Sequence, residues 1–184
     1  AFLGSTVCYS PHCLAAFRAW LEKSYGSLDA LNATWGTSFS RWDEVTPCQL
    51  KEIATPDNLS RWLDHKMFMA EVYAREWVGK TGRYLREAAP GTMSGLSGTQ
   101  IPGYSYDWAQ LMKYIDFLAY YNGVQTKVVH DFAAPGFVSG QWGGGYMPAH
   151  MIREAYQRCP QWSNLFRGAN VQPNWTGGAM NGDL

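Results

Sequence analysis

The chain has 184 residues, of which 46% are hydrophobic and 15% aromatic, and its 15 basic and 15 acidic side chains cancel to a formal charge of zero. This composition is typical of one folded globular domain and excludes a disordered chain, because enough apolar surface is available to offset the entropy of ordering. No run approaches the roughly 20 apolar residues of a membrane-spanning helix, so no membrane partner is expected, and the balanced charge argues against a nucleic-acid partner.

Two helices and an irregular connection are predicted in the first third of the chain. Ser10 can cap a helix that Pro11 can start, and apolar residues then recur at helical spacing until a glycine ends the element at residue 26. A shorter helix is expected over 27–34. Residues 37–57 contain two prolines and little periodicity, which predicts an irregular connection across a surface.

The longest predicted helix runs from about Asn58 to Ala88, and Pro90 and Gly91 stop it. Apolar side chains recur along this helix at helical spacing, which predicts that one of its faces is buried. The predicted buried stripe consists of Trp62, Met69, Val72, Tyr73, Trp77 and Tyr84.

Short apolar segments alternate with helical segments in the rest of the chain. Strands are expected over 92–97, 116–121, 137–141 and 168–175, and helices over 107–114, 124–132 and 148–159. Four strand–helix repeats predict an α/β fold, in which crossover helices connect the strands of a parallel sheet.

An open doubly wound sheet and a closed (β/α)8 barrel both satisfy this pattern. The glycines at 143–145 do not form the Gly-x-Gly-x-x-Gly motif of dinucleotide-binding sheets, because no glycine stands at the motif's last position. No Gly-Lys-Ser/Thr phosphate loop occurs either, and both observations favour the barrel. Since the chain is shorter than the roughly 250 residues typical of that barrel, we expect a partial (β/α)8 TIM barrel with about the last four strand–helix units.

A dense pattern over residues 8–45 carries a resemblance to a known family. It reads CYSPHCLAAFRAWL at 8–21, LDALN at 28–32, WGTSF at 35–39 and WD at 42–43. This pattern resembles glycoside hydrolase family 42, the β-galactosidases, and looks like the segment that follows the fourth strand of their catalytic barrel. A looser similarity continues through DFLAYYN at 116–122, PQW at 160–162 and GAN at 168–170.

The resemblance implies that residues 1–184 are the C-terminal half of a catalytic barrel. Residues 1–57 would form the cysteine-containing helical segment after the fourth strand, and 58–184 the later strand–helix units. The implied activity is retaining hydrolysis of terminal β-galactosides in carbohydrate degradation, with a galactoside as the substrate partner. The family also suggests a homo-oligomer, a trimer.

Retaining hydrolysis needs two carboxyl groups roughly 5 Å apart, one as acid/base and one as nucleophile. In the family the acid/base belongs to an Asn-Glu pair at the end of the fourth strand, which here would precede Ala1. The nucleophile ends the seventh strand, where this sequence has Gln141. The nearest acids, Asp131 and Glu154, are expected to be surface charges. The catalytic residues therefore stay unassigned, and the chain alone is expected to be inactive.

An inactive carbohydrate-binding relative without the nucleophile is the alternative function. Barrel enzymes place their substrate contacts at the carboxyl ends of the strands. That rule selects Tyr121, Asn122, Trp142 and Trp175 as substrate-binding residues. Either tryptophan could stack on a pyranose ring and Asn122 could bind a hydroxyl group, whereas core or rim packing is the alternative role for each aromatic side chain.

No cofactor is required for the implied catalysis, but family members carry a zinc cluster with a Cys-x-Cys-x-x-Cys segment and one earlier cysteine. Cys8 and Cys13 match the first and last cysteine of that segment, and Ser10 stands at the middle position. His12 or Cys48 would have to complete the site, because two thiolates alone hold zinc poorly. Reduced, partly buried thiols are the alternative.

Overall fold

A computed structural model describes residues 8–49, 52, 57–99, 106–120, 129, 131–142, 162–171 and 173. The chain forms two compact units, Ala1–Tyr73 and Ala74–Leu184. None of the helices among these described residues is long and apolar enough to cross a membrane. The predicted division of the chain after residue 57 rests on sequence pattern and stays a prediction.

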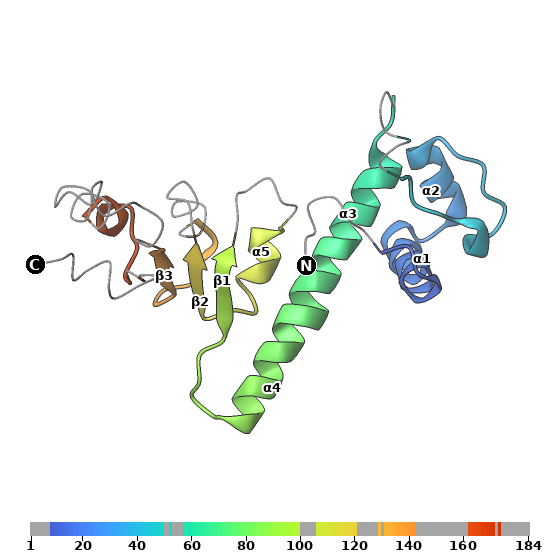
Figure 1. The fold of residues 1–184 in the computed structure, drawn as a ribbon. Helices are drawn as coiled ribbons and strands as arrows, with labels where there is room; N and C mark the ends of the chain where they lie inside the picture. Colours follow the sequence, from blue (N-terminus) through green and yellow to red (C-terminus); the bar gives the residue numbers. More distant parts are fainter. Residues whose placement is uncertain are drawn as a thin grey trace, which may run out of the picture. The chain divides into compact units, whose positions relative to one another are not determined.

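The first unit contains helices α1 (Pro11–Tyr25), α2 (Leu28–Trp35) and α3 (Ser60–Val72), shown in Figure 1. The two predicted N-terminal helices are thus confirmed. Each begins at a serine whose side chain accepts a backbone N–H, and each ends at a glycine with a left-handed backbone conformation (φ 72° at residue 26 and 67° at residue 36). Serine caps and left-handed glycines are the signals that a sequence shows at helix ends.

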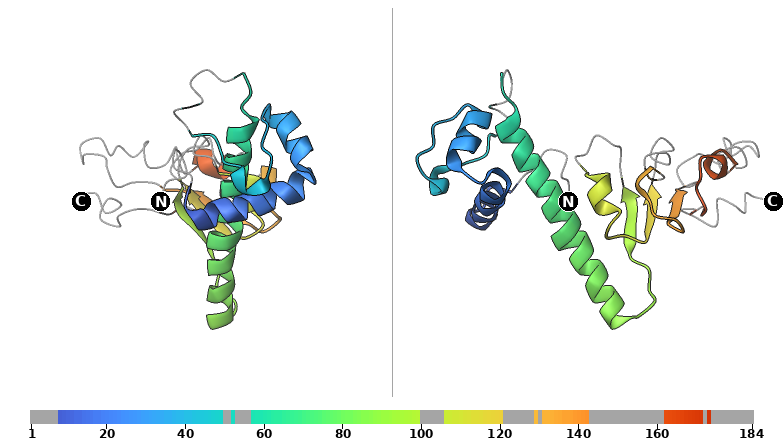
Figure 2. Two further views of the ribbon diagram at one scale, coloured as in Figure 1. Left: turned by 90° about the vertical axis from the view of Figure 1, so that its right-hand side faces the viewer. Right: turned by 180° about the vertical axis from the view of Figure 1, so that it is seen from behind.

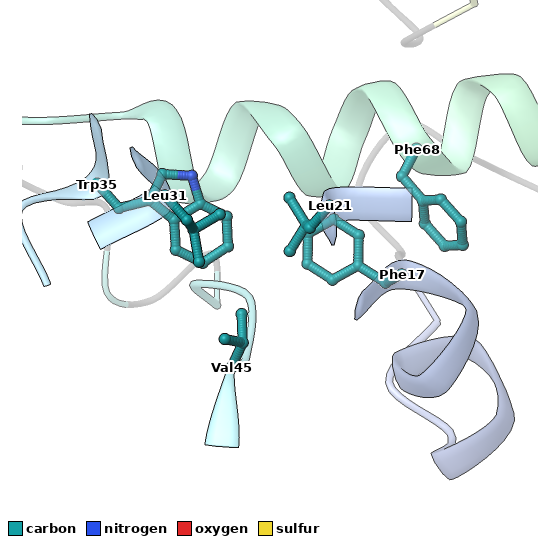
Figure 3. Close-up of a cluster of buried hydrophobic side chains, with 6 residues drawn as sticks. All are labelled: Phe17, Leu21, Leu31, Trp35, Val45 and Phe68. Atoms are coloured by element: carbon teal, nitrogen blue, oxygen red, sulfur yellow. The ribbon is translucent and has the colours of Figure 1, made fainter. Parts of the chain in front are cut away.

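The core of this unit is an aromatic and aliphatic cluster contributed by all three helices and by the connection before α3. Figure 3 shows its buried members: Phe17, Leu21, Leu31, Trp35, Val45 and Phe68. Two carboxylates of α3 accept hydrogen bonds at the edges of the cluster. Trp20 Nε1 donates to Glu71 Oε2 (2.8 Å), and Trp35 Nε1 donates to Asp64 Oδ2 (2.7 Å).

The predicted irregular connection is confirmed over the part of residues 37–57 that the structure describes, apart from 3-10 conformation at Trp42–Glu44 and at Glu52. Arginine side chains from two helices hold this segment. Arg18 Nε donates to the Val45 carbonyl (2.8 Å), and Arg61 donates to the backbone and hydroxyl oxygens of Thr46 (2.7 and 2.9 Å).

The long predicted helix exists, but it is not α-helical throughout. A π-helical segment at Tyr73–Gly79 separates α3 from α4 (Lys80–Ala88). The predicted buried stripe is wrong at its end, since Trp77 is 67% and Tyr84 53% exposed, while Ala74 and Gly82 are buried. A π-turn closes i→i+5 hydrogen bonds, so it changes which face the later residues occupy relative to a continuous α-helix.

The second unit contains a parallel sheet of three strands in the order β1 (Gly95–Thr99), β2 (Phe117–Tyr120) and β3 (Val138–Gln141). The strands lie side by side in Figure 1 and in the right-hand view of Figure 2. Three predicted strands are confirmed, although β1 begins later than expected. The parallel arrangement confirms the predicted α/β class.

The fourth predicted strand, 168–175, is only partly described and is not a strand over 168–171. These residues nevertheless lie along β3. The backbone N–H groups of Asn170 and Val171 donate to the Ser139 carbonyl (2.9 and 3.2 Å), and Asn170 Oδ1 accepts the Ser139 N–H (2.8 Å). Gly140 allows this approach, because a Cβ atom there would stand 2.2 Å from the Val171 carbonyl oxygen.

Helix α5 (Trp108–Leu111) is shorter than the predicted 107–114 helix, but Trp108 and Leu111 are buried as expected. A helix over 162–166 was not predicted. Of the predicted 124–132 helix the structure describes only residues 129, 131 and 132, which are helical, and the predicted 148–159 helix lies outside the described residues.

Candidate functional site

The carboxyl ends of the three parallel strands meet at one edge of the sheet, where the sequence predicted substrate contacts. Trp142 directly follows β3 and lies at this edge. Its backbone N–H donates to the Tyr120 carbonyl (2.7 Å), which extends the β2–β3 ladder by one residue. Its indole Nε1 donates to Ser97 Oγ on β1 (3.2 Å). The side chain of Trp142 therefore spans the sheet from β3 to β1 and is half-buried.

A distortion of β1 accompanies the Ser97–Trp142 hydrogen bond. The pairing of β1 with β2 is irregular between Ser97 and Thr99, and Gly98 between them has a left-handed backbone conformation (φ 68°). Glycine adopts that conformation without steric cost, and bulges of this kind re-aim neighbouring side chains. The sequence contains no clear signal for Ser97, because a serine in a short strand is unremarkable until its partner is known.

Of the predicted substrate-binding residues, the structure describes only Trp142. Tyr121, Asn122 and Trp175 lie outside the described residues. The position of Trp142 at the carboxyl edge is the one that the sequence predicted, and its contact with substrate stays a prediction.

Carboxylates are not found in the three described strands. β3 ends at Gln141, so an amide stands at the strand end where the resemblance places a nucleophile. Asp131 is exposed, and Glu154 lies outside the described residues.

Asp116 stands at the opposite end of the sheet, before β2. Its Oδ2 accepts the Ser94 N–H (2.9 Å) and a hydrogen bond from Arg86 (3.3 Å) on α4. Arg86 also donates to the hydroxyl of Ser94 (3.2 Å). These hydrogen bonds connect α4 to the sheet. Since active sites of barrels lie at the carboxyl ends of the strands, we assign Asp116 a structural role.

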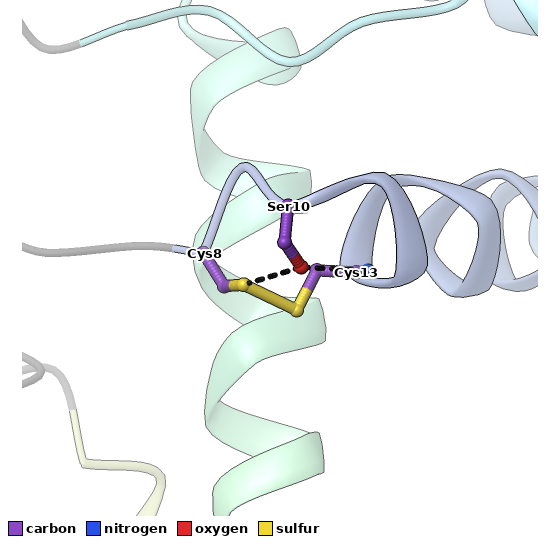
Figure 4. The surroundings of a disulfide bond; sticks show 3 residues. All are labelled: Cys8, Ser10 and Cys13. Atoms are coloured by element: carbon purple, nitrogen blue, oxygen red, sulfur yellow. Dashed lines mark hydrogen bonds between the residues drawn. A yellow bond between two sulfur atoms is a disulfide. The ribbon is translucent and has the colours of Figure 1, made fainter.

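The cysteines of the predicted metal site are bonded to each other. Figure 4 shows the Cys8–Cys13 disulfide at the start of α1, with the Ser10 hydroxyl 3.2 Å from Cys8 Sγ. The expectation of reduced thiols is therefore wrong for this pair, because two thiols that a helix cap brings together can join covalently.

The remaining residues named for the metal site do not complete it. Within the described parts of the chain, no three histidine, cysteine or acidic side chains stand close enough to hold a metal ion. The Cys48 thiol contacts the Gln49 carbonyl (3.6 Å), and burial raises the pKa of this thiol. His12 is exposed. These residues do not fit a four-ligand zinc cluster.

His65 is a buried titratable residue that the sequence analysis missed. Its ring is 1% exposed and lies against Tyr9, Phe17 and Phe68, with centroids 5.1, 4.8 and 6.5 Å away. Burial lowers the pKa of His65 to about 4, and the nearby backbone of Cys8 raises this pKa by a smaller amount. Neither ring nitrogen of His65 completes a hydrogen bond. Such a ring is a core side chain that stays neutral, and a histidine in a helix carries no local signal for this.

Comparison with known proteins gives one family and one fold. The sequence profile of glycoside hydrolase family 42, described as beta-galactosidase, matches residues 3–139. The beta-galactosidase BgaA of Thermus sp. is 36% identical over 91 residues, which are 48% of this chain and 14% of that protein. The beta-galactosidase bgaB of Geobacillus kaustophilus is 30% identical over 120 residues, which are 61% of this chain and 17% of that protein.

Solved structures show the same fold at low sequence identity. The beta-galactosidase from Bacillus circulans sp. alkalophilus superimposes with a TM-score of 0.70 and 19% identity, over 92% of this chain and 28% of that one. The catalytic domain of a beta-amylase from Paenibacillus polymyxa gives a TM-score of 0.67 and 16% identity, over 95% and 51% of the two chains. These superpositions show that the parallel sheet of the chain is part of a (β/α)8 barrel. The chain spans less than a fifth of the length of the Thermus and Geobacillus beta-galactosidases.

Proposed function

The chain belongs to glycoside hydrolase family 42, and we propose that it is the later part of the catalytic barrel of an enzyme that hydrolyses terminal β-galactosides. The observation that carries this proposal is the family match over residues 3–139, which includes the strands β1 and β2 and the approach to the site edge. Relatives that match the chain are named beta-galactosidase. The substrate class is therefore a carbohydrate with a β-linked galactose.

The proposed mechanism is retaining, with one carboxyl group as acid/base and a second as nucleophile. Neither is assigned to this chain. No acidic residue precedes Cys8, and an amide such as Gln141 cannot form the glycosyl ester of the covalent intermediate. Since the chain spans only 14% and 17% of two named relatives, we propose that other parts of the parent protein complete the carboxylate pair.

Trp142 is the described residue best placed to bind the sugar. A galactose ring has an apolar face, which packs on flat aromatic surfaces, and its hydroxyl groups need polar partners. Ser97 holds the indole by its only N–H group, so the ring is oriented before substrate arrives. Tyr121, Asn122 and Trp175 are proposed as further contacts on the same edge.

The test is turnover of nitrophenyl glycosides by the full-length parent protein. We expect release of nitrophenol from the β-galactoside, much less from the β-glucoside and α-galactoside, and a first-formed sugar with retained β-configuration by NMR. Absence of turnover with all three glycosides, by a folded parent protein, would contradict the proposal. Light scattering on the same sample tests the proposed homo-oligomer.

The second candidate function is binding of galactosides without hydrolysis, and Gln141 at the end of β3 favours it. In this case calorimetry would detect galactose binding to the parent protein while nitrophenol release stays at the buffer rate. The variant Gln141→Glu separates the two: it would gain turnover only if the strand end faces the anomeric carbon and the partner acid is present.

A further inference from the structure

We infer that Cys8 and Cys13 form a reversible thiol–disulfide site, which this chain carries where the family resemblance implies a zinc cluster. The two cysteines are five positions apart and joined by a disulfide. The inference concerns the N-terminal unit alone and is independent of the proposed hydrolytic activity.

Ser10 is the first reason why zinc does not fit. Its hydroxyl contacts Cys8 Sγ (3.2 Å) and accepts the Cys13 N–H (3.3 Å), so it lies between the two cysteines and serves as the helix cap. A neutral hydroxyl group is a much weaker zinc ligand than a thiolate. A cysteine at this position would supply the third thiolate, and serine leaves only two sulfur atoms, which can bond to each other.

The surroundings of the pair favour reversible chemistry. Both cysteines are partly exposed, so small thiols and disulfides can reach them. Cys13 is the third residue of α1, where the free N–H groups of the first helical turn stabilise a thiolate. Closing a loop this short restricts the unfolded chain less than closing a long loop, so reduction leaves most of the stability of the unit intact.

Contacts other than the disulfide hold the segment before α1 in place. The Tyr9 hydroxyl donates to the Cys48 carbonyl (3.1 Å), and its ring packs edge-on against His65. The cap from Ser10 to Cys13 also involves no sulfur atom. The pair can therefore open and close without loss of the helix.

The reaction is thiol–disulfide exchange with a small-molecule disulfide such as oxidised glutathione. The Cys13 thiolate attacks one glutathione sulfur and expels the first glutathione thiolate. The Cys8 thiolate then attacks Cys13 Sγ and expels the second. The two protons of the protein thiols pass to the two leaving thiolates, and two electrons pass from the protein to glutathione.

The test uses the full chain equilibrated with oxidised and reduced glutathione at several ratios, acid-quenched, alkylated and digested with trypsin. Trypsin cleaves first after Arg18, so the peptide of residues 1–18 carries both Cys8 and Cys13. We expect this peptide to change from two alkyl groups to none with a single midpoint, while the Cys48 peptide stays alkylated at every ratio. A peptide that is alkylated twice at all ratios would overturn the inference.

Metal content provides the second measurement. The reduced chain, loaded with zinc and dialysed, is expected to hold well under one zinc per chain by mass spectrometry of the metal. Ser10→Cys should raise the zinc content toward one, and Ser10→Ala, the matched control, should not. One zinc per wild-type chain would overturn the inference, and its loss in His65→Phe would identify the missing ligand.

Discussion

His65 illustrates how one buried side chain makes the stability of the first unit depend on pH. Its ring is almost fully buried among Tyr9, Phe17 and Phe68, and burial away from water disfavours the charged form of the ring. Burial lowers the pKa of His65 from 6.5 to about 4, and the Lys66 charge acts in the same direction. The folded chain therefore binds fewer protons than the unfolded chain between these two values.

The first prediction is that the chain loses stability as the pH falls from about 6.5 to 4. The full stability of the unit is present above pH 6.5 and decreases through this window, by at most about 3.4 kcal/mol in the free energy of unfolding. Urea unfolding at several pH values measures it. His65→Phe keeps the aromatic packing and should show a smaller decrease. Equal decreases in both proteins would contradict the assignment.

Trp142 and Ser97 give the second prediction, at the carboxyl edge of the sheet. In the full-length parent protein, Trp142→Ala should lower kcat/KM for a β-galactoside by about 1 to 3 kcal/mol in transition-state terms, because it removes the stacking surface. Ser97→Ala removes one hydrogen bond to the indole. Its effect should be smaller, about 0.5–1.5 kcal/mol, and seen mainly in KM.

The control for this pair is Ser97→Thr, which keeps the hydroxyl group and should behave like the wild type. If Trp142→Ala leaves kcat/KM within a factor of two, Trp142 packs at the rim of the barrel and does not bind the sugar.

At the scale of elements, α1 and α2 are held to α3 by hydrophobic packing and by carboxylates that accept hydrogen bonds. Asp64 on α3 is the clearest case. Its Oδ2 accepts from the Tyr25 hydroxyl (2.6 Å) and from Trp35 Nε1 (2.7 Å). Burial and this carboxylate together raise the pKa of Tyr25 to about 12, which keeps the hydroxyl protonated as the donor.

The third prediction is that Asp64→Ala destabilises the chain by about 2 to 3 kcal/mol, because it leaves two partly buried donors without their acceptor. Asp64→Asn keeps an acceptor oxygen and should cost less. Asp43→Ala is the matched control, since its ion pair with Arg41 is 59% and 69% exposed, and it should change stability by less than about 1 kcal/mol. Equal losses for Asp64→Ala and Asp43→Ala in urea unfolding would refute the anchoring role.

At the scale of the whole molecule, the first unit has its own hydrophobic core and the second its own parallel sheet. The chain covers 28% of one solved beta-galactosidase with a TM-score of 0.70. A (β/α)8 barrel has eight strands, and the structure describes three of them here. The described residues therefore show only part of the carboxyl edge of such a barrel.

The fourth prediction is that the 184-residue chain alone releases nitrophenol from a β-galactoside no faster than buffer, while the full-length parent protein does so readily. The physical reason is that retaining hydrolysis needs both carboxyl groups in one pocket. The measurement is a nitrophenol assay at matched concentrations, with circular dichroism to show that the chain is folded. Turnover by the chain alone would place a complete carboxylate pair within these residues.

The sequence alone determined the elements with strong local signals and the family. Serine caps, left-handed glycines and apolar spacing define α1 and α2 within one residue of their bounds, and the pattern at 8–45 identifies glycoside hydrolase family 42. Such signals are local because each depends on residues within one or two helical turns.

Only the tertiary structure decided which distant groups meet. It set Ser97 on β1 against Trp142 after β3, and it enclosed His65 between the rings of Tyr9 and Phe17. It also left Trp77 exposed, within a π-helical segment of a helix that the sequence pattern had treated as regular. These outcomes depend on contacts between residues far apart in the chain and on small departures from ideal helix geometry, and neither leaves a periodic trace in the sequence.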